Sequence, residues 1–231
     1  MKTIGILGGL GPQATMDFEA RLHAAAQSLI PAHGNSSYPP LAVYYHRRSP
    51  FVMQDERTPM FPLQPDPDLL EAAHWLGTRA DFLVITANGP HIIQAQIEQA
   101  SGCKVLSMIE VTLAEVQRRG WHTIGILGFG PPDVPVYTQP LGQLNLAGEI
   151  ITPELQGPLN VAVMRMQEGR ANTDDTLAVR EAVIYLRNKQ VDGIILGCTE
   201  LPLLLPAYVD EPDLINPTQL LAEAAVRYAL A

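Results

Sequence analysis

Cys198 is the residue with the clearest potential for chemistry in this sequence. It lies in the segment GCTEL, directly after an apolar run that is typical of a buried strand, and Thr199 and loop amides follow it. A free thiol ionises near pH ~8.5, and neighbouring amides or helix N-termini lower that value, so a thiol here could transfer protons. A small, inert, buried side chain is the other interpretation, because unpaired cysteines are commonly buried. Cys103 precedes an expected strand and is predicted to be structural.

A second segment matches the one that carries Cys198. Residues 81–88 read DFLVITAN and residues 192–199 read DGIILGCT, so each has an Asp, an apolar strand and a small polar turn. In this alignment Ala87 takes the place of Cys198. The hexapeptide TIGILG also occurs twice, at residues 3–8 and 123–128. Two repeats in the same order predict two related lobes, and a single doubly wound sheet that reuses a common strand pattern is the alternative.

Elements alternate between apolar strands and helical patterns along the chain, which indicates parallel sheets with helices on both faces. The expected strands lie near residues 3–7, 41–45, 82–86, 104–108, 123–127, 149–151 and 193–196. The expected helices lie near residues 13–28, 67–78, 92–100, 111–119, 135–142, 176–189 and 217–230. Ligands of such sheets gather outside the carboxyl ends of the strands, where Ala87 and Cys198 are predicted to lie.

The glycine-rich loop GGLGPQAT follows the first expected strand and opens a helix. Gly9 and Gly11 give a loose dinucleotide fingerprint, but the expected acidic residue about 20 positions later is missing. His46, Arg47 and Arg48 follow the second strand instead, which keeps an NADP enzyme as an alternative. Otherwise the glycines let the backbone and a helix N-terminus approach a small carboxylate.

Composition narrows the possible partners. The chain has 231 residues, is 47% hydrophobic and carries a net charge of −9, without an evident basic stripe. This argues against nucleic acid and anionic membranes, and leaves a small acidic ligand possible because a local field can oppose the net charge. No signal peptide or membrane-spanning run is visible, and the two cysteines have no disulfide or metal-site spacing. A reduced cytoplasm is therefore the expected location.

Five segments together resemble the aspartate/glutamate racemase family, the cofactor-independent amino-acid racemases: MKTIGILGGLGPQAT, DERTP, DFLVITANGPH, SMIEVT and LGCTELPLLLP. The resemblance implies two similar three-layer α/β/α lobes with parallel sheets, related by a pseudo-twofold axis, with the active site in the cleft between them. It also implies a homodimer and a small amino or carboxylic acid substrate. We place the first lobe at residues 1–102 plus 207–231 and the second at 103–206. Neither a metal nor pyridoxal phosphate is expected, and the lysines lie away from the strand-end loops.

In the family two cysteines, one per lobe, face the two sides of the substrate's α-carbon. Carried over by position, Cys198 matches the second cysteine and Ala87 stands where the family has the first. The resemblance also implies a supporting role for His91 and substrate-binding roles for Gly9, Leu10, Gly11, Arg57, Asn88, Gly89, Thr199, Glu200 and Arg165.

The departures from the family pattern are concentrated around the first cysteine position. Gly89-Pro90 follows Asn88 where the family has Thr-Ala, which favours natural divergence over a single engineered change at Ala87. The family's substrate-binding lysine has no clear equivalent. Arg165 lies near it in register, and Gln167 is the other residue that could align. The loop GFGPPD at residues 128–133 also replaces a threonine-rich loop.

These residues predict a racemase-family enzyme whose two-base racemisation is crippled, with Cys198 as its only acid/base thiol. Thr86 is adjacent to Ala87, but neighbouring strand side chains face opposite ways and a hydroxyl is a poorer base. A one-sided reaction, such as isomerisation or decarboxylation followed by protonation, fits one thiol better. The alternative of a different class is a non-catalytic protein that binds a small amino or carboxylic acid.

Overall fold

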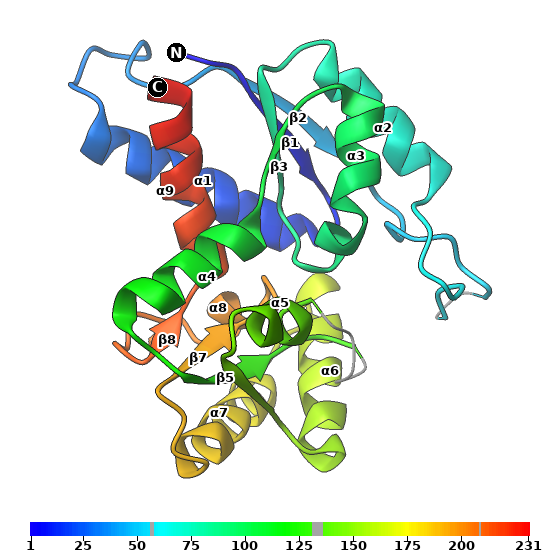
Figure 1. Cartoon of the computed structure of the whole chain (residues 1–231), viewed down its shortest axis with the longest axis vertical. Coiled ribbons are helices and arrows are strands. Elements are labelled where there is room, and N and C mark those ends of the chain that lie inside the picture. Colours follow the sequence, from blue (N-terminus) through cyan, green and yellow to red (C-terminus); the bar gives the residue numbers. More distant parts are fainter. Residues whose placement is uncertain (56–57, 131–135, 208) are drawn as a thin grey trace. The chain divides into compact units, whose positions relative to one another are not determined.

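The computed structural model of the protein describes residues 1–55, 58–130, 136–207 and 209–231. The chain divides into two compact units, Met1–Met108 with Thr218–Ala231, and Ile109–Pro217. Each unit is an α/β unit built on its own parallel four-stranded sheet (Figure 1). The prediction of two α/β lobes is confirmed, and a single continuous sheet is excluded.

The sheet of the first unit has the order β2-β1-β3-β4, and all its pairs are parallel. Its strands are β1 (Ile4–Gly8), β2 (Leu41–Tyr45), β3 (Phe82–Ile85) and β4 (Val105–Leu106). Every residue of β1 and β3 is buried, as expected for central strands covered on both faces. The loops that follow the carboxyl ends of β1 and β3 therefore begin at rigid, buried strands.

Helices cover both faces of this sheet (Figure 1). They are α1 (Pro12–Leu29), α2 (Pro67–Gly77), the 3₁₀ helix η1 (Gly89–Ile93), α3 (Gln94–Ser101) and α9 (Pro217–Leu230). Leu83 and Ile85 pack in one core cluster with residues of α2 and α3. Phe82 points the other way and meets the ring of Tyr228 in α9, with ring centroids 4.7 Å apart. The strand alternation thus assigns α2 and α3 to one face and α9 to the other.

The second unit repeats this arrangement with the order β6-β5-β7-β8, again all parallel. Its strands are β5 (Thr123–Leu127), β6 (Ala147–Ile150), β7 (Gly193–Leu196) and β8 (Leu214–Ile215). Its helices are α4 (Met108–Arg119), α5 (Thr138–Gln143), α6 (Pro153–Gln167), α7 (Thr173–Asn188) and α8 (Leu201–Leu204). Strands β1 and β5, which carry the identical hexapeptide, hold the same place in their sheets, and so do β3 and β7.

The two aspartates that begin the repeated segments have the same structural role. Asp81 accepts a hydrogen bond from the backbone N–H of Thr3 at 2.6 Å, and Asp192 accepts one from Thr123 at 2.9 Å. Each carboxylate joins the start of one central strand to the start of its neighbour. This part of the repeat therefore lies at the amino ends of the strands and serves the fold.

The boundaries between the units differ from those expected at residues 103 and 207. Strand β4 pairs with β3, so the chain stays in the first unit up to Met108. Strand β8 pairs with β7, so it stays in the second unit up to Pro217. Both strands have only two residues, too short for an apolar run to show which sheet they join.

Three elements were not expected from the sequence: α6, α8 and β8. Helix α6 contains Gly157 and Pro158, which usually interrupt helices, so its pattern did not indicate one long helix. The strand expected at 104–108 ends after Leu106, and Met108 begins α4. Residue 135, the expected start of the next helix, lies outside the described residues, and α5 is described from Thr138.

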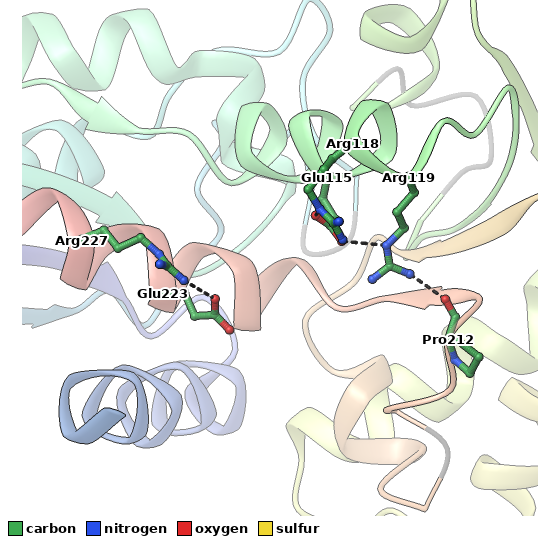
Figure 2. A network of polar contacts seen from close by, with 6 residues as sticks. All are labelled: Glu115, Arg118, Arg119, Pro212, Glu223 and Arg227. Carbon is green, nitrogen blue, oxygen red and sulfur yellow. Dashed lines mark hydrogen bonds and ion pairs between the residues drawn. The ribbon is translucent and has the colours of Figure 1, made fainter. Parts of the chain in front are cut away.

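Polar contacts anchor the end of α4 within the second unit (Figure 2). Glu115 accepts hydrogen bonds from Arg118 at 2.6 Å and from Arg119 at 2.7 Å. Arg119 also donates to the carbonyl of Pro212 at 2.6 Å, which ties α4 to the turn before β8. In the described parts of the chain, no helix is long and apolar enough to cross a membrane.

Candidate active site

The loop after β3 carries Ala87 and Asn88 and continues into η1. Ala87 is the second residue after the strand and is half-buried, whereas Asn88 is buried. The neighbouring hydroxyl of Thr86 is only 1% exposed and shares a 2.8 Å hydrogen bond with the hydroxyl of Thr15 in α1. Thr86 is thus engaged inside the unit, and Ala87 itself offers no group that could accept or donate a proton.

The loop after β1 lies beside it and is held by the same threonine. The backbone N–H of Gly9 donates to the hydroxyl of Thr15 at 2.9 Å, and that hydroxyl lies 3.2 Å from the carbonyl of Gly11. Gly9 has a φ of 80°, and a Cβ there would lie 2.7 Å from the backbone of His46, so only glycine fits. Thr15 therefore joins the loops after β1 and β3, a role that the motif GGLGPQAT alone does not indicate.

The side chain of His91 is fixed by backbone groups. Its Nδ1 lies 3.0 Å from the carbonyl of Ala87 and 3.2 Å from that of Asn88. Its Nε2 lies 3.0 Å from the backbone N–H of Met108, the first residue of α4. Burial lowers the pKa of His91 to about 4, against the smaller opposing effect of the two carbonyls. The imidazole is therefore neutral at pH 7.

Several residues predicted to bind ligand have other partners or lie outside the described chain. Arg47 stacks on the ring of Tyr45, and Arg48 forms an ion pair with Asp68. These are the residues that had suggested an NADP site. Arg57 lies outside the described residues, so its predicted contact with a carboxylate stays a prediction. Leu10 is half-buried and packs against the core cluster between the sheet and α2.

Cys198 is the second residue after β7, the position that Ala87 occupies after β3. Its side chain is buried, with 7% of the residue exposed. The sulfur lies 3.2 Å from Oε2 of Glu200, close enough for the thiol to donate a hydrogen bond to the carboxylate. The equivalence of these two positions was predicted from the repeat, and the sheet topology bears it out.

Glu200 is the centre of a small polar network around the thiol. Only 2% of the residue is exposed, and its Oε2 also accepts a 3.2 Å hydrogen bond from the hydroxyl of Thr199. Its Oε1 accepts one at 3.0 Å from the side-chain amide of Gln167, at the end of α6. The carboxylate is thus buried but satisfied by neutral donors.

The electrostatics of this network favour a protonated thiol. Burial raises the pKa of Cys198 well above its usual value, and the negative charge of Glu200 raises it further. The backbone N–H of Glu200 opposes both effects by bonding to the sulfur. The thiol is therefore a proton donor, and it becomes a base only after its own proton has moved away.

Arg165 contacts a different part of the second unit. It forms an ion pair with Asp175 at 3.2 Å, and Asp175 belongs to the capping box that begins α7. Gln167, two residues later on α6, is the residue that reaches Glu200. Of the two residues that could align with the family's lysine, Gln167 is the one connected to the thiol. The sequence pattern does not predict α6, and without that helix it does not determine which way the side chains of Arg165 and Gln167 point.

Tyr137 is a second residue that sequence reasoning missed. It directly precedes α5 and is buried, and its hydroxyl is hydrogen-bonded to Thr112. A Cβ on Gly197 would lie 3.3 Å from the Tyr137 ring and 2.9 Å from the carbonyl of Leu127. The backbone before Cys198 is thus closely packed on one side, which restricts where the thiol can lie.

Comparison with known proteins gives a consistent result over the whole chain. A family model described as Asp/Glu/Hydantoin racemase matches residues 7–225. The broad specificity amino-acid racemase RacX of Bacillus subtilis strain 168 is 25% identical to this chain, and the match covers 99% of this chain and 98% of RacX.

Solved structures share the fold. A putative Asp/Glu racemase from Yersinia pestis matches with a TM-score of 0.76 and 21% identity, covering 100% of both chains. The aspartate racemase of Picrophilus torridus matches with a TM-score of 0.75 and 20% identity, covering 99% of this chain and 94% of the other. At these identities the likeness supports the architecture alone.

Proposed function

Because the chain belongs to the Asp/Glu/hydantoin racemase family, we propose that it transfers a proton at the α-carbon of a small amino or carboxylic acid, with Cys198 as its one acid/base thiol. The contact of 3.2 Å between the Cys198 sulfur and Glu200 is the observation that carries this proposal. A buried thiol beside a buried carboxylate is a pair of groups between which a proton can pass.

The proposed step uses groups that are already in contact. When Cys198 acts as an acid, its S–H bond breaks and a C–H bond forms at a carbanionic α-carbon, leaving a thiolate. When it acts as a base, its proton first passes to Oε2 of Glu200, and the thiolate then takes the α-proton. The electron pair of the broken C–H bond is delocalised into the substrate carboxylate, which needs hydrogen-bond donors to stabilise it.

We assign the donors for that carboxylate to the strand-end loops, following the family pattern. In the first unit these are the backbone N–H groups of Gly11, Asn88 and Gly89, with Leu10 beside them, while Gly9, whose N–H is bonded to Thr15, shapes the loop. In the second unit Thr199 offers its amide, and its hydroxyl becomes a donor to the substrate when it turns away from Glu200. Backbone N–H groups at strand ends and helix starts suit an anion because they carry partial positive charge.

Ala87 limits the reaction to one face of the α-carbon. A two-base racemase needs an acid/base group on each side, and Ala87 cannot supply one. We therefore propose a one-sided reaction: exchange of the α-proton at one face, isomerisation, or decarboxylation followed by stereospecific protonation. Racemisation by this chain is expected to be slow even where exchange is fast.

Deuterium incorporation tests the proposal directly. Candidate amino and carboxylic acids, each enantiomer separately, are incubated with the protein in D₂O, and NMR follows the signal of the α-proton. We expect exchange without equal loss of stereochemical purity, and a fall of at least roughly 100-fold in Cys198→Ala, as for removal of an acid/base group. Cys103→Ala is the matched control, because its thiol lies between the carbonyls of Gly77 and Ala80 and takes no part.

A non-catalytic binding protein is the second candidate function. The alanine at position 87 and the raised pKa of the Cys198 thiol favour it, since both weaken proton transfer. The same experiment separates the two candidates. Saturable binding of an acid, with no exchange or conversion that depends on Cys198, would overturn the enzymatic proposal.

Four further expectations accompany the proposed function. The reaction should proceed without added pyridoxal phosphate, and NADP(H) should not raise the melting temperature of the protein. The chain should form a homodimer, which sedimentation measures. A cytoplasmic location is also expected, because Cys103 and Cys198 are both free.

A further inference from the structure

His91 contacts three backbone groups that come from two separate segments. Its Nδ1 lies within hydrogen-bond distance of the carbonyls of Ala87 and Asn88, in the loop after β3. Its Nε2 lies within hydrogen-bond distance of the N–H of Met108, seventeen positions later in the chain. A single side chain therefore connects the candidate site loop to the first residue of α4.

These contacts determine which nitrogen of the ring carries the proton. The backbone N–H of Met108 can only donate, so Nε2 must accept and has no hydrogen. The two carbonyls can only accept, so Nδ1 must carry the hydrogen and donate it. The neutral Nδ1–H tautomer is the one form that satisfies all three groups. An imidazolium would place a second N–H against that of Met108, at the positive end of a helix.

Both ring nitrogens are thus used by the backbone, and neither is left to exchange a proton with a substrate. The consequence lies instead in the direction of the peptide units. In a planar trans peptide the C=O and N–H bonds point in opposite directions. Since the carbonyls of Ala87 and Asn88 are turned toward His91, the N–H groups of Asn88 and Gly89 point away from it.

We propose that His91 is a positioning residue that clamps the loop after β3 onto the start of α4. By holding the carbonyls of Ala87 and Asn88, it fixes the direction of the amides of Asn88 and Gly89, which are the proposed donors to the substrate carboxylate. The clamp follows from the contacts of His91, and only its effect on the substrate rests on the proposed function.

Two conservative variants divide the clamp into its halves. Asn places an amide where the imidazole has Nδ1, so His91→Asn retains a donor to the loop but does not reach Met108. Gln reaches as far as Nε2, so His91→Gln retains an acceptor for Met108 but offers no donor to the loop. His91→Leu removes both halves. Ile97→Val, a core change in α3 of the same unit that leaves His91 itself intact, controls for lost stability.

The tautomer and the clamp are measured without a substrate. Nitrogen-15 NMR of labelled histidines, with His91 assigned from its variants, should show the Nδ1–H tautomer unchanged from pH 7.5 to pH 5.5. Amide hydrogen exchange at Met108 should accelerate roughly tenfold in His91→Asn and His91→Leu, and stay near the wild-type rate in His91→Gln and Ile97→Val. An Nε2–H tautomer, or equal exchange at Met108 in all variants, would overturn the clamp.

Substrate binding then tests the positioning role. For the acid that shows Cys198-dependent exchange, His91→Gln and His91→Leu should raise KM roughly tenfold, with a smaller change in kcat, because the loop amides lose their direction. His91→Asn should restore much of the binding. If the NMR signature holds and KM is equal in all variants, the clamp exists but does not position donors. If no acid exchanges at all, the proposed function fails while the exchange data still decide the clamp.

Discussion

The loops after β3 and β7 start from the same place in two sheets of identical strand order, yet they carry different groups. After β7 the second position is Cys198, whose thiol lies against Glu200. After β3 it is Ala87, whose carbonyl is bonded to a neutral imidazole. One loop has kept a group that can move a proton. The other has kept a rigid backbone whose function, in our proposal, is to bind.

The positions just before them differ in a complementary way. In the second unit Gly197 precedes the thiol and is crowded by Tyr137 and the carbonyl of Leu127. In the first unit the equivalent residue is Thr86, whose side chain is accommodated by its hydrogen bond to Thr15. The residue before the loop position is therefore supported by an aromatic ring in one unit and by a pair of hydroxyls in the other. The two strand ends hold equivalent places in their sheets and carry different chemistry.

Ala87→Cys should restore the chemical equivalence of the two loops and produce the largest effect. A second thiol at the equivalent position supplies the missing acid/base group, so racemisation of the bound acid should rise by roughly 100-fold, as expected for one such group. Polarimetry or chiral chromatography measures the rate, beside α-deuterium exchange in the same samples.

Ala87→Ser is the matched control, because it adds a group of similar size that is a much weaker base than a thiolate. Racemisation by the cysteine variant alone would support the proposal. If the cysteine variant binds the acid but does not racemise it, the missing thiol at position 87 is not the main reason that racemisation is slow. The altered residues Gly89 and Pro90 in the same loop, and those of the segment 128–133, then become the candidates.

Much of this comparison could be predicted from the sequence, because it depends on local patterns. The repeated apolar strands, their aspartates and the two strand ends are contiguous in the chain, and the equivalence of Ala87 and Cys198 follows from them. The supporting contacts could not be predicted. Thr15 meets Thr86, and Gln167 meets Glu200, across long separations in sequence. Such contacts depend on how helices pack on a sheet, which periodicity alone does not determine.

Gly197→Ala should break the packing that holds the thiol loop. The added Cβ would lie 2.9 Å from the carbonyl of Leu127 and 3.3 Å from the ring of Tyr137, so the backbone before Cys198 must shift. Overpacking of this kind typically costs about 1–3 kcal/mol. Thermal unfolding followed by circular dichroism measures the loss.

Gly128→Ala is the matched control for that change. Gly128 follows the neighbouring strand β5, and a Cβ there would meet no atom of the described residues within 4 Å. Its melting temperature should remain close to that of the wild type. An equal loss in both variants would mean that the cost comes from a backbone conformation at the strand end that alanine adopts less readily than glycine, rather than from the contact with Tyr137.

Glu200→Gln should have the smallest effect, and it tests why the thiol of Cys198 stays protonated. Burial is the first cause of the raised pKa of Cys198 and remains in the variant, whereas the negative charge of Glu200 is removed. An amide can still accept from Gln167 and can now donate to the sulfur, which favours the thiolate. The pKa of Cys198 should therefore fall, so its thiolate should form at lower pH than in the wild type.

Alkylation by iodoacetamide at pH 8 should accelerate by roughly three- to tenfold, since only a small part of the thiol is ionised there. Peptide mass spectrometry follows Cys198 and Cys103 in the same sample, and Cys103 should alkylate at an unchanged rate. If the pH profile of Cys198 does not move relative to that of Cys103, burial alone holds the thiol proton, and Glu200 is then a structural partner rather than the acceptor that makes Cys198 a base.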